Sequence, residues 1–256
     1  MLTMTILIKN REEIKKIRKA CKIAGKVLEA IQDKIAPGID TESLDEFAEK
    51  MILKFKAYPA FKGYRGYPKT ICASINNEVV HGIPSRDRIL KSGDIISIDL
   101  GVRFKGYYGD VAATFGVGKI SLLAKKLIET TRNSLYIGIS KAQAGNKLGD
   151  ISSAIENYVN QHGFSVVRRF VGHGIGKQLH EEPEIPNFGF PGEGPELKNG
   201  MVLAIEPMVN AGSYEVEILK DGWTAITKDG KLSAHFEHTI LISGEQPEIL
   251  TEFNYG

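Results

Sequence analysis

Apolar residues recur every three to four positions in four segments of the chain, and this spacing predicts four amphipathic helices. The first covers residues 11–35 and ends before Pro37-Gly38, a pair that breaks helices. The second follows Thr41, which we interpret as its N-cap. The other two are predicted at residues 122–137 and 148–161. Lysines and glutamates fill the positions between the apolar residues, as expected for helices with one solvated face.

The remaining apolar runs are shorter and rich in β-branched residues, which predicts strands. A loop rich in tyrosine and glycine, residues 61–68, precedes them. The predicted strands are residues 70–74, 95–102, 106–113, 166–171, 201–206, 215–219, 223–227 and 235–242, with 106–113 returning on 95–102 as a hairpin. Helices and strands therefore combine in an α+β fold.

The order helix, glycine break, helix, strands occurs twice along the chain. Gly38 and Gly145 occupy equivalent places in the two copies, which cover roughly residues 10–118 and 119–245. Any two amphipathic helices would align as well, so this pattern alone leaves a duplication open. Since no linker rich in proline or serine separates the copies, we expect residues 1–256 to form one pseudo-symmetric domain.

Composition excludes several classes of protein. Of the 256 residues 42% are hydrophobic and 25% charged, which is typical of a globular protein rather than a disordered one. The net charge of +2 argues against a dedicated nucleic-acid-binding protein. Cys21 and Cys72 are too few for a disulfide framework and suit a reducing compartment. With neither a signal-peptide pattern nor a long apolar run, we expect a cytoplasmic protein without membrane or specific nucleic-acid partners.

The chemistry must come from acidic residues and histidines, because phosphate-loop, nucleophile-elbow and zinc-helix motifs are all missing from the sequence. Asp99 lies within an apolar strand, on the face opposite Ile98 and Leu100. Asp110 follows eleven residues later, and a hairpin would bring both carboxylates to one end of the sheet. A carboxylate in such a strand must be paired, hydrogen-bonded or bound to a metal.

Three further residues have similar settings. His173 lies between two glycines, Glu206 ends an apolar strand, and Glu237 shares a strand face with His235 while His238 lies on the other. Ordinary ion pairs would also account for such residues. If all of them share one pocket, however, four carboxylates cannot remain ionised without cations. Two divalent ions would neutralise the cluster and form a two-metal hydrolytic site that activates water.

At these positions the sequence resembles a known family. The residues Asp99, Asp110, His173, Glu206 and Glu237 match, in order and in context, the five metal ligands of the methionine aminopeptidases of the pita-bread fold. The matching contexts are Asn-Glu-Val-Val-His-Gly-Ile-Pro (77–84), Gly-His-Gly-Ile-Gly (172–176), His-Glu-Glu-Pro (180–183), Ile-Glu-Pro-Met (205–208) and Phe-Glu-His-Thr (236–239). The resemblance covers about residues 8–250 and is to the short bacterial type I form.

The resemblance implies a pseudo-two-fold pair of helix-helix-β halves around a dinuclear metal site. One divalent cation would be held by Asp110, His173, Glu206 and Glu237, and the second by Asp99, Asp110 and Glu237. Cobalt, manganese, iron, zinc and nickel all suit these ligands, and availability would decide among them.

The resemblance also implies roles for other residues. His81 would contact the scissile nitrogen, His180 would stabilise the oxyanion, and Glu206 would shuttle the proton. The methionine pocket would consist of Tyr64, Tyr67, Cys72 and Trp223 together with the two histidines. The sequence departs from the family at three nearby positions, because Phe61, Leu179 and Gly101 replace a small residue or cysteine, a phenylalanine and a threonine. The first two departures concern the shape of the pocket, and the third concerns a hydrogen bond beside the metal ligands that is lost or replaced by water.

The implied activity is co-translational removal of N-terminal methionine when the next residue is small. Its substrates would be nascent polypeptides with a deformylated N-terminal methionine, encountered at the ribosome surface, and the enzyme would be a monomer. One alternative is an X-Pro aminopeptidase or prolidase, which shares all five ligands but usually has a further N-terminal domain. Another is a non-enzymatic pita-bread binding module, which has generally lost metal ligands.

Overall fold

The computed structural model describes residues 6–254 and contains four α-helices. They are α1 (Arg11–Gln32), α2 (Thr41–Lys54), α3 (Leu122–Lys141) and α4 (Leu148–Gln161). All four predicted helices are therefore present, the first three residues shorter and the third four residues longer than expected. A short 3₁₀ helix, η1 (Tyr64–Gly66), lies in the loop rich in tyrosine and glycine.

The start of α2 corrects one prediction. The N-cap is Asp40, whose carboxylate accepts a hydrogen bond from the backbone N–H of Ser43 at 2.8 Å. Thr41 is the first helical residue, and its hydroxyl exchanges hydrogen bonds with the backbone of Ser85 instead. The prediction of Thr41 as the cap was wrong because an acidic cap precedes it.

The strands form one large sheet and two small ones. The large sheet has nine strands in the order β1-β4-β5-β14-β9-β7-β8, with β2 on β4 and β15 on β14. Its members are β1 (Tyr58–Pro59), β2 (Cys72–Ile75), β4 (Ile95–Phe104), β5 (Tyr107–Gly116), β7 (Gly172–Gly174), β8 (Glu181–Ile185), β9 (Val202–Ile205), β14 (Glu237–Leu241) and β15 (Glu248–Ile249). The small sheets are β13 (Ser233–His235), β10 (Met208–Asn210) and β6 (Ser165–Val166), and β11 (Val216–Ile218), β12 (Ala225–Thr227) and β3 (Glu78–Val80).

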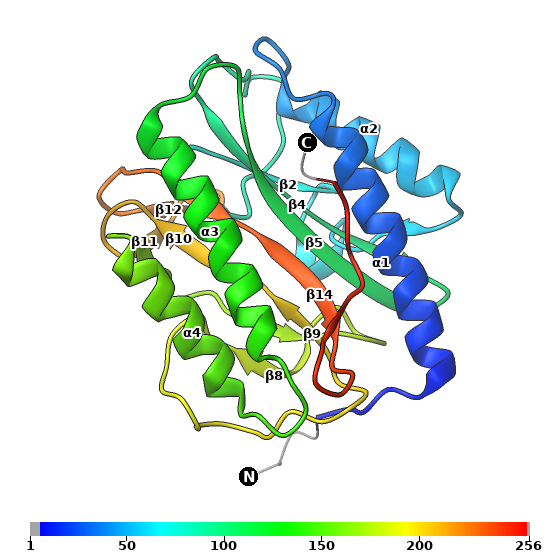
Figure 1. Ribbon diagram of the computed structural model, residues 1–256. Coiled ribbons are helices and arrows are strands. Elements are labelled where there is room, and N and C mark those ends of the chain that lie inside the picture. Colours follow the sequence, from blue (N-terminus) through cyan, green and yellow to red (C-terminus); the bar gives the residue numbers. More distant parts are fainter. Residues whose placement is uncertain (1–5, 255–256) are drawn as a thin grey trace.

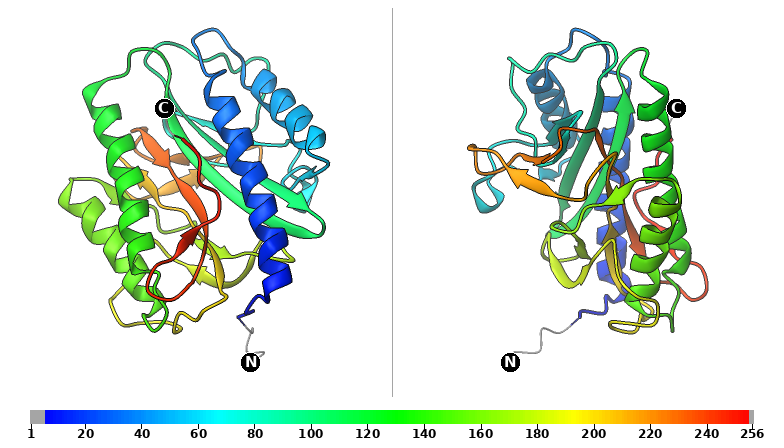
Figure 2. Two further views of the ribbon diagram at one scale, coloured as in Figure 1. Left: turned by 45° about the vertical axis from the view of Figure 1, so that its right-hand side comes forward. Right: turned by 90° about the vertical axis from the view of Figure 1, so that its left-hand side faces the viewer.

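The long helices cover one face of the large sheet, as Figure 1 shows. α1 packs against β4 and β5, while α3 packs against α4 and the centre of the sheet. Ile96, Ile98 and Leu100 of β4 are fully buried in the core that these helices complete. The C-terminal segment passes between α1 and α3, where β15 pairs with β14 (Figure 2). The opposite face of β4 is left for polar residues.

The strands of the two predicted halves of the chain meet where β5 pairs with β14. Glu237 lies opposite Ala112, and His238 lies opposite Val111. One helix pair, α1 and α2, precedes β5, and the other, α3 and α4, precedes β14. The middle of the large sheet is therefore the place to which both halves bring residues.

Two predicted strands differ from the structure. Of the predicted strand 166–171 only Val166 lies in a strand, β6, and the chain bends at residues 168–169, where the Arg168 side chain pairs with Glu156 and stacks on Tyr214. The predicted strand 235–242 is two strands that belong to different sheets, since the chain changes sheet at Phe236.

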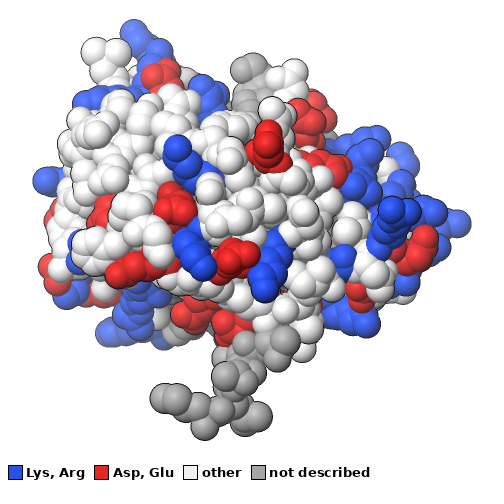
Figure 3. All heavy atoms as spheres, turned by 60° about the horizontal axis from the view of Figure 1, so that its bottom comes forward, with Lys and Arg blue, Asp and Glu red and all other residues white. Residues whose placement is uncertain are grey.

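The surface carries charges of both signs. In the view of Figure 3, Lys and Arg are interspersed with Asp and Glu, in keeping with the small net charge. In the part of the chain that the structure describes, none of the helices has the length and apolar character needed to cross a membrane.

Candidate metal centre and substrate cavity

The β4–β5 hairpin brings the two aspartates together, as their spacing predicts. Asp110 pairs with Gly101, and Asp99 pairs with Ala112, two positions along the same ladder. Residues two apart on neighbouring strands share a face and are diagonal neighbours. Both carboxylates therefore point to the face of the sheet that the helices leave open.

The neighbouring strands supply the other three residues. Glu237 begins β14, Glu206 directly follows β9, and His173 lies in the middle of β7. Ligand atoms of Asp110, His173 and Glu237 lie within 4.8 Å of one another. The Glu206 carboxylate lies 3.5 Å from Nε2 of His173, and Asp99 lines the same cavity. All five predicted metal ligands are thus brought together from adjacent strands of one sheet.

Burial makes this cluster unfavourable as a set of anions. It raises the pKa of Asp99, Glu206 and Glu237 well above the usual range, and mutual repulsion among the carboxylates adds to the effect. Burial also raises the pKa of Asp110 to about 7. The carboxylates need protons or cations to remain together.

The donor set fits divalent cations. Asp99 Oδ1 and Glu237 Oε1 are buried and have no hydrogen-bond partner among the described residues. Nδ1 of His173 donates to the carbonyl of Gly174 at 2.9 Å, which leaves Nε2 unprotonated toward the carboxylates. Burial lowers the pKa of His173 to about 4, so the imidazole is neutral, as a metal ligand must be. Orphaned carboxylate oxygens beside a neutral imidazole are what a metal centre requires.

A cavity of about 180 Å³ opens onto the cluster. Besides the five acidic and histidine residues it is lined by Tyr64, Tyr67, Cys72, His81, His180 and Trp223, all predicted, and by Phe61, Leu179 and Arg65. Most of these side chains are apolar or aromatic. The residues that the family resemblance implies for the metal centre and the pocket therefore line one continuous cavity, although they are up to 173 positions apart in the chain.

The apolar wall is fixed by hydrogen bonds from Tyr67 to the backbone and by contact between aromatic rings. The Tyr67 hydroxyl donates to the carbonyl of Ile71 at 2.9 Å, and its ring contacts Trp223 edge-on at 5.1 Å between centroids. Burial raises the pKa of the Cys72 thiol well above its usual value, so this group is neutral. The wall suits an uncharged side chain.

His81 directly follows β3 and has a left-handed backbone, with φ at 61°. The Arg88 guanidinium, which is paired with Glu78, donates to the carbonyls of Ile83 and Ala73 and holds this turn. The imidazole lies edge-on to Phe170, and burial lowers its pKa to about 4. A neutral His81 is thus fixed at the cavity wall.

His180 lies at the mouth of the cavity. Its Nδ1 is 2.7 Å from the Tyr64 hydroxyl, and its ring centroid is 4.3 Å from that of His173. Loss of water from one side of the ring, and repulsion from His173 and Arg65, lower the pKa of His180, although the residue remains exposed. A wider cleft of about 570 Å³ begins here and shares Arg65, His173 and His180 with the cavity.

Known proteins have the same sequence pattern and fold. The sequence model of metallopeptidase family M24 matches residues 15–244. The chain belongs to this family. Its similarity to the methionine aminopeptidase of Clostridium perfringens is 56% identity, covering 96% of this chain and 98% of the relative. Methionine aminopeptidase 1 of Bacillus subtilis is 53% identical, covering 96% of this chain and 99% of the relative.

Solved structures of M24-like fold agree. The methionine aminopeptidase of Thermotoga maritima superposes with a TM-score of 0.96 at 45% identity, covering 97% of this chain and all of that one. The prolidase of Pyrococcus horikoshii superposes with a TM-score of 0.79 at 26% identity, covering 97% of this chain and 64% of that one. The pita-bread fold expected from the sequence is confirmed, and an M24 metallopeptidase uses divalent metal.

Two residues near the centre of this M24 metallopeptidase were not among the predicted site residues. Nε2 of His235 is buried and lies 3.6 Å from the Glu206 carboxylate. It has no hydrogen-bond partner among the described residues. The sequence did offer a signal for His235, because it lies two positions before Glu237 and was expected on the same strand face. Arg65 lines the cavity mouth from a left-handed backbone position, for which the sequence offers no comparable signal.

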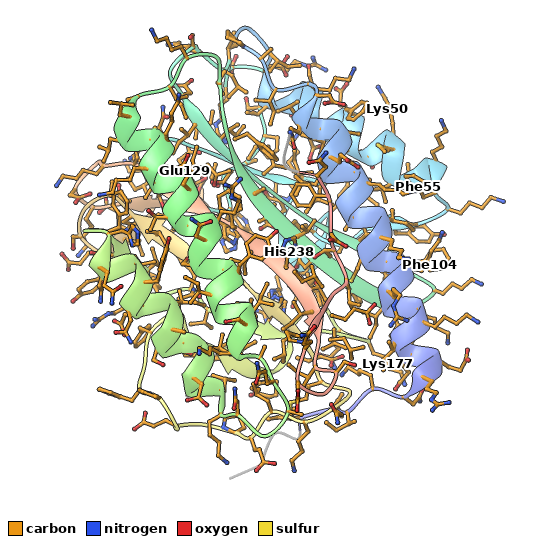
Figure 4. All side chains as sticks on the ribbon, in the orientation of Figure 1. Lys50, Phe55, Phe104, Glu129, Lys177 and His238 are labelled. Atoms are coloured by element: carbon orange, nitrogen blue, oxygen red, sulfur yellow. The ribbon has the colours of Figure 1, made fainter. Side chains whose placement is uncertain are left out.

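His238 lies on the opposite face of β14, as alternation predicts. Figure 4 shows it on the side of the sheet that the helices cover. Its ring nitrogens contact the hydroxyls of Tyr136 on α3 at 3.3 Å and of Thr251 at 3.0 Å. This histidine joins β14 to α3 and to the C-terminal segment, away from the metal centre.

Proposed function

We propose that this chain is a metal-dependent aminopeptidase that removes the N-terminal methionine of nascent polypeptides when the second residue is small. The observation that carries the proposal is the single cavity in which a carboxylate cluster adjoins an apolar, aromatic wall. The high identity with methionine aminopeptidases over nearly the whole chain supports it. We place the activity in the cytoplasm, on deformylated chains emerging from the ribosome.

Two divalent cations would occupy the centre. Asp110, His173, Glu206 and Glu237 would hold one, and Asp99, Asp110 and Glu237 the other, so that Asp110 and Glu237 are shared. When bound, such ions lower the pKa of water and polarise a carbonyl group. The unpartnered oxygens of Asp99 and Glu237 support this assignment.

The protein's own groups would move the protons and stabilise charge. Glu206, whose carboxylate lies 3.5 Å from Nε2 of His173 at the centre, would accept a proton from the attacking water and return it to the departing amine. His81, neutral and fixed in the wall, would contact the scissile nitrogen. His180, which Tyr64 orients at the cavity mouth, would donate to the developing oxyanion.

The shape of the cavity accounts for specificity. The part of the cavity lined by Tyr67, Cys72 and Trp223 suits an unbranched thioether, which is apolar and polarisable. Charged side chains would lose water there without gaining a partner. A free α-amine would lie near the carboxylates of the centre, so an acylated N-terminus would be refused.

The alternatives have less support. An X-Pro peptidase would share the fold, but the prolidase of Pyrococcus horikoshii is 26% identical, whereas the methionine aminopeptidases of Clostridium perfringens and Bacillus subtilis are 56% and 53% identical. A non-enzymatic binding module is disfavoured because all five ligand residues are present and converge.

A side-by-side peptidase assay tests the proposal. The metal-loaded protein is given Met-Ala-Ser, formyl-Met-Ala-Ser and Gly-Pro-Ala peptides, and release of the first amino acid is measured. We expect release of methionine from the first peptide only. Preferential cleavage of the Gly-Pro peptide would assign the X-Pro activity instead, and lack of cleavage of any peptide with each metal tested would favour the binding module.

A further inference from the structure

The segment before α1 sends one lysine into the interior. The backbone N–H of Lys9 donates to the carbonyl of Gly200 at 2.8 Å, and its side chain is only 5% exposed. Its ammonium pairs with the carboxylate of Glu181, which is 4% exposed and 172 residues away in the sequence. Lysine and glutamate are almost never buried to this extent unless they are paired.

The ion pair lies inside the loop that connects β7 to β8. The other carboxylate oxygen of Glu181 accepts from the backbone N–H of Gln178 at 3.0 Å, which closes the loop on itself. Lys9 also fills the space beside Gly176, where a Cβ atom would lie 2.6 Å from Cε of the lysine. Lys9 therefore supports the conformation of this loop from inside, through its pair with Glu181 and its packing beside Gly176.

This loop carries a residue of the cavity at each end. His173 precedes it on β7, and His180 is the residue directly before Glu181. His180 is exposed, and its Nδ1 is held by the Tyr64 hydroxyl. The position of its backbone depends on Glu181, and hence on the charge of Lys9.

Buried ion pairs are a poor way to gain stability. The cost of removing two charges from water commonly equals or exceeds their attraction, and an apolar pair of similar size is often as stable. A buried pair that adjoins a reacting group is better explained by the position it gives to that group.

We propose that Lys9 is a positioning residue for His180, acting through Glu181 to hold the imidazole at the position where the substrate carbonyl is attacked. The inference rests on the proposed function, because it needs His180 to act on substrate. It adds a residue from outside the cavity to the machinery of the reaction.

The first test replaces the charge and keeps the length. Lys9→Met should lower kcat on a Met-Ala peptide by about 10-fold to 10²-fold, as expected when a reacting group is misplaced by about 1 Å. KM and metal content should stay within twofold of the parent. The matched control is Lys177→Met, on the same loop but 65% exposed at its side chain, which should leave kcat within twofold.

The second test asks whether Lys9 acts through His180. In a His180→Ala background Lys9→Met should cost less than twofold, since the positioned group is already gone. An equal loss of kcat in the parent and in the His180→Ala background would overturn the inference. A folded Lys9→Met protein with unchanged kcat would overturn it too, and so would a loss of kcat that is explained by lost metal. If Lys9→Met does not fold, Lys9→Met with Glu181→Gln leaves no unpaired buried charge, and the same kcat criteria apply to it. Failure of the proposed function would be seen separately, as a parent protein that does not release methionine.

Discussion

A Cβ atom built on Gly101 would lie 2.7 Å from Cε1 of Phe61. The same atom would lie 2.8 Å from Cβ of Ala60, so position 101 has no room for a side chain. Phe61 and Gly101, two of the departures from the family pattern, are therefore linked by direct packing. The ring of Phe61, which lines the cavity, occupies the space that a side chain at position 101 would need.

This contact gives the first prediction. Gly101→Ala should destabilise the protein by about 1–3 kcal/mol, as overpacking does, and should push the Phe61 ring toward the cavity and lower kcat/KM. Phe61→Ala should cost less in the Gly101→Ala background than in the parent, because it removes the clash with the ring and leaves only the contact with Ala60. Denaturant unfolding and kcat/KM of the four proteins measure the coupling. Strictly additive effects would show that the two positions are independent.

Removal of metal should abolish activity. The buried carboxylates are unfavourable as bare anions, so we expect chelation to stop methionine release and Mn, Co or Fe to restore it. Asp99→Ala and Glu237→Ala should not be rescued at the metal concentrations that saturate the parent. Metal content is measured alongside activity. Full activity in a demonstrably metal-free preparation would refute the metal-dependent mechanism.

The two cavity histidines should affect the reaction and not the metal. His81→Ala and His180→Ala should keep the parent's metal content and lose about 10²–10³-fold in kcat, the usual effect of removing one hydrogen bond to the transition state. Elemental analysis of the purified variants separates the two roles. Loss of metal from either variant would mean that its histidine is a ligand.

The neutral state of His81 should also be visible in stability against pH. Its pKa is about 4 in the folded protein and 6.5 ordinarily, so between these values the unfolded chain binds more protons. The stability that comes from a neutral His81 is complete above pH 6.5 and is lost as pH falls toward 4. Relative to the parent, His81→Gln should therefore gain up to about 3 kcal/mol in free energy of unfolding between pH 7 and pH 4. The measurement is the free energy of unfolding against pH for the parent and for His81→Gln, both with chelator. Two parallel curves would show that the protonation of His81 does not affect stability.

Local pattern was sufficient for the helices and for the aspartate pair. Alternation places Asp99 on the face opposite Ile98 and Leu100. Asp110 follows only eleven residues later in the sequence, which favours a hairpin between the two aspartates. Local pattern failed at residues 166–171, where valines favour a strand but the chain bends at residues 168–169 and Arg168 pairs with Glu156. β-propensity is overridden when tertiary contacts satisfy a segment better.

The convergence of the other ligands depends on sheet order. His173 and Glu206 meet because β7 pairs with β9, an arrangement that local spacing does not specify. The resemblance to a family implied that these residues converge. Neither local spacing nor the resemblance indicated that Lys9 is buried against Glu181. Contacts between distant segments are the part of the site that residue patterns leave undetermined.

The central claim is that one cavity combines the metal centre with a pocket for methionine followed by a small residue. The most direct measurement is the rate of release of the first amino acid from metal-loaded enzyme and peptides that differ only at the second position. We predict rapid release of methionine from Met-Ala, Met-Gly and Met-Ser peptides, and rates lower by about 10²-fold or more for Met-Lys and Met-Phe, since excluding a bulky group costs a few kcal/mol. Equal turnover of the Met-Ala and Met-Phe peptides would contradict the account.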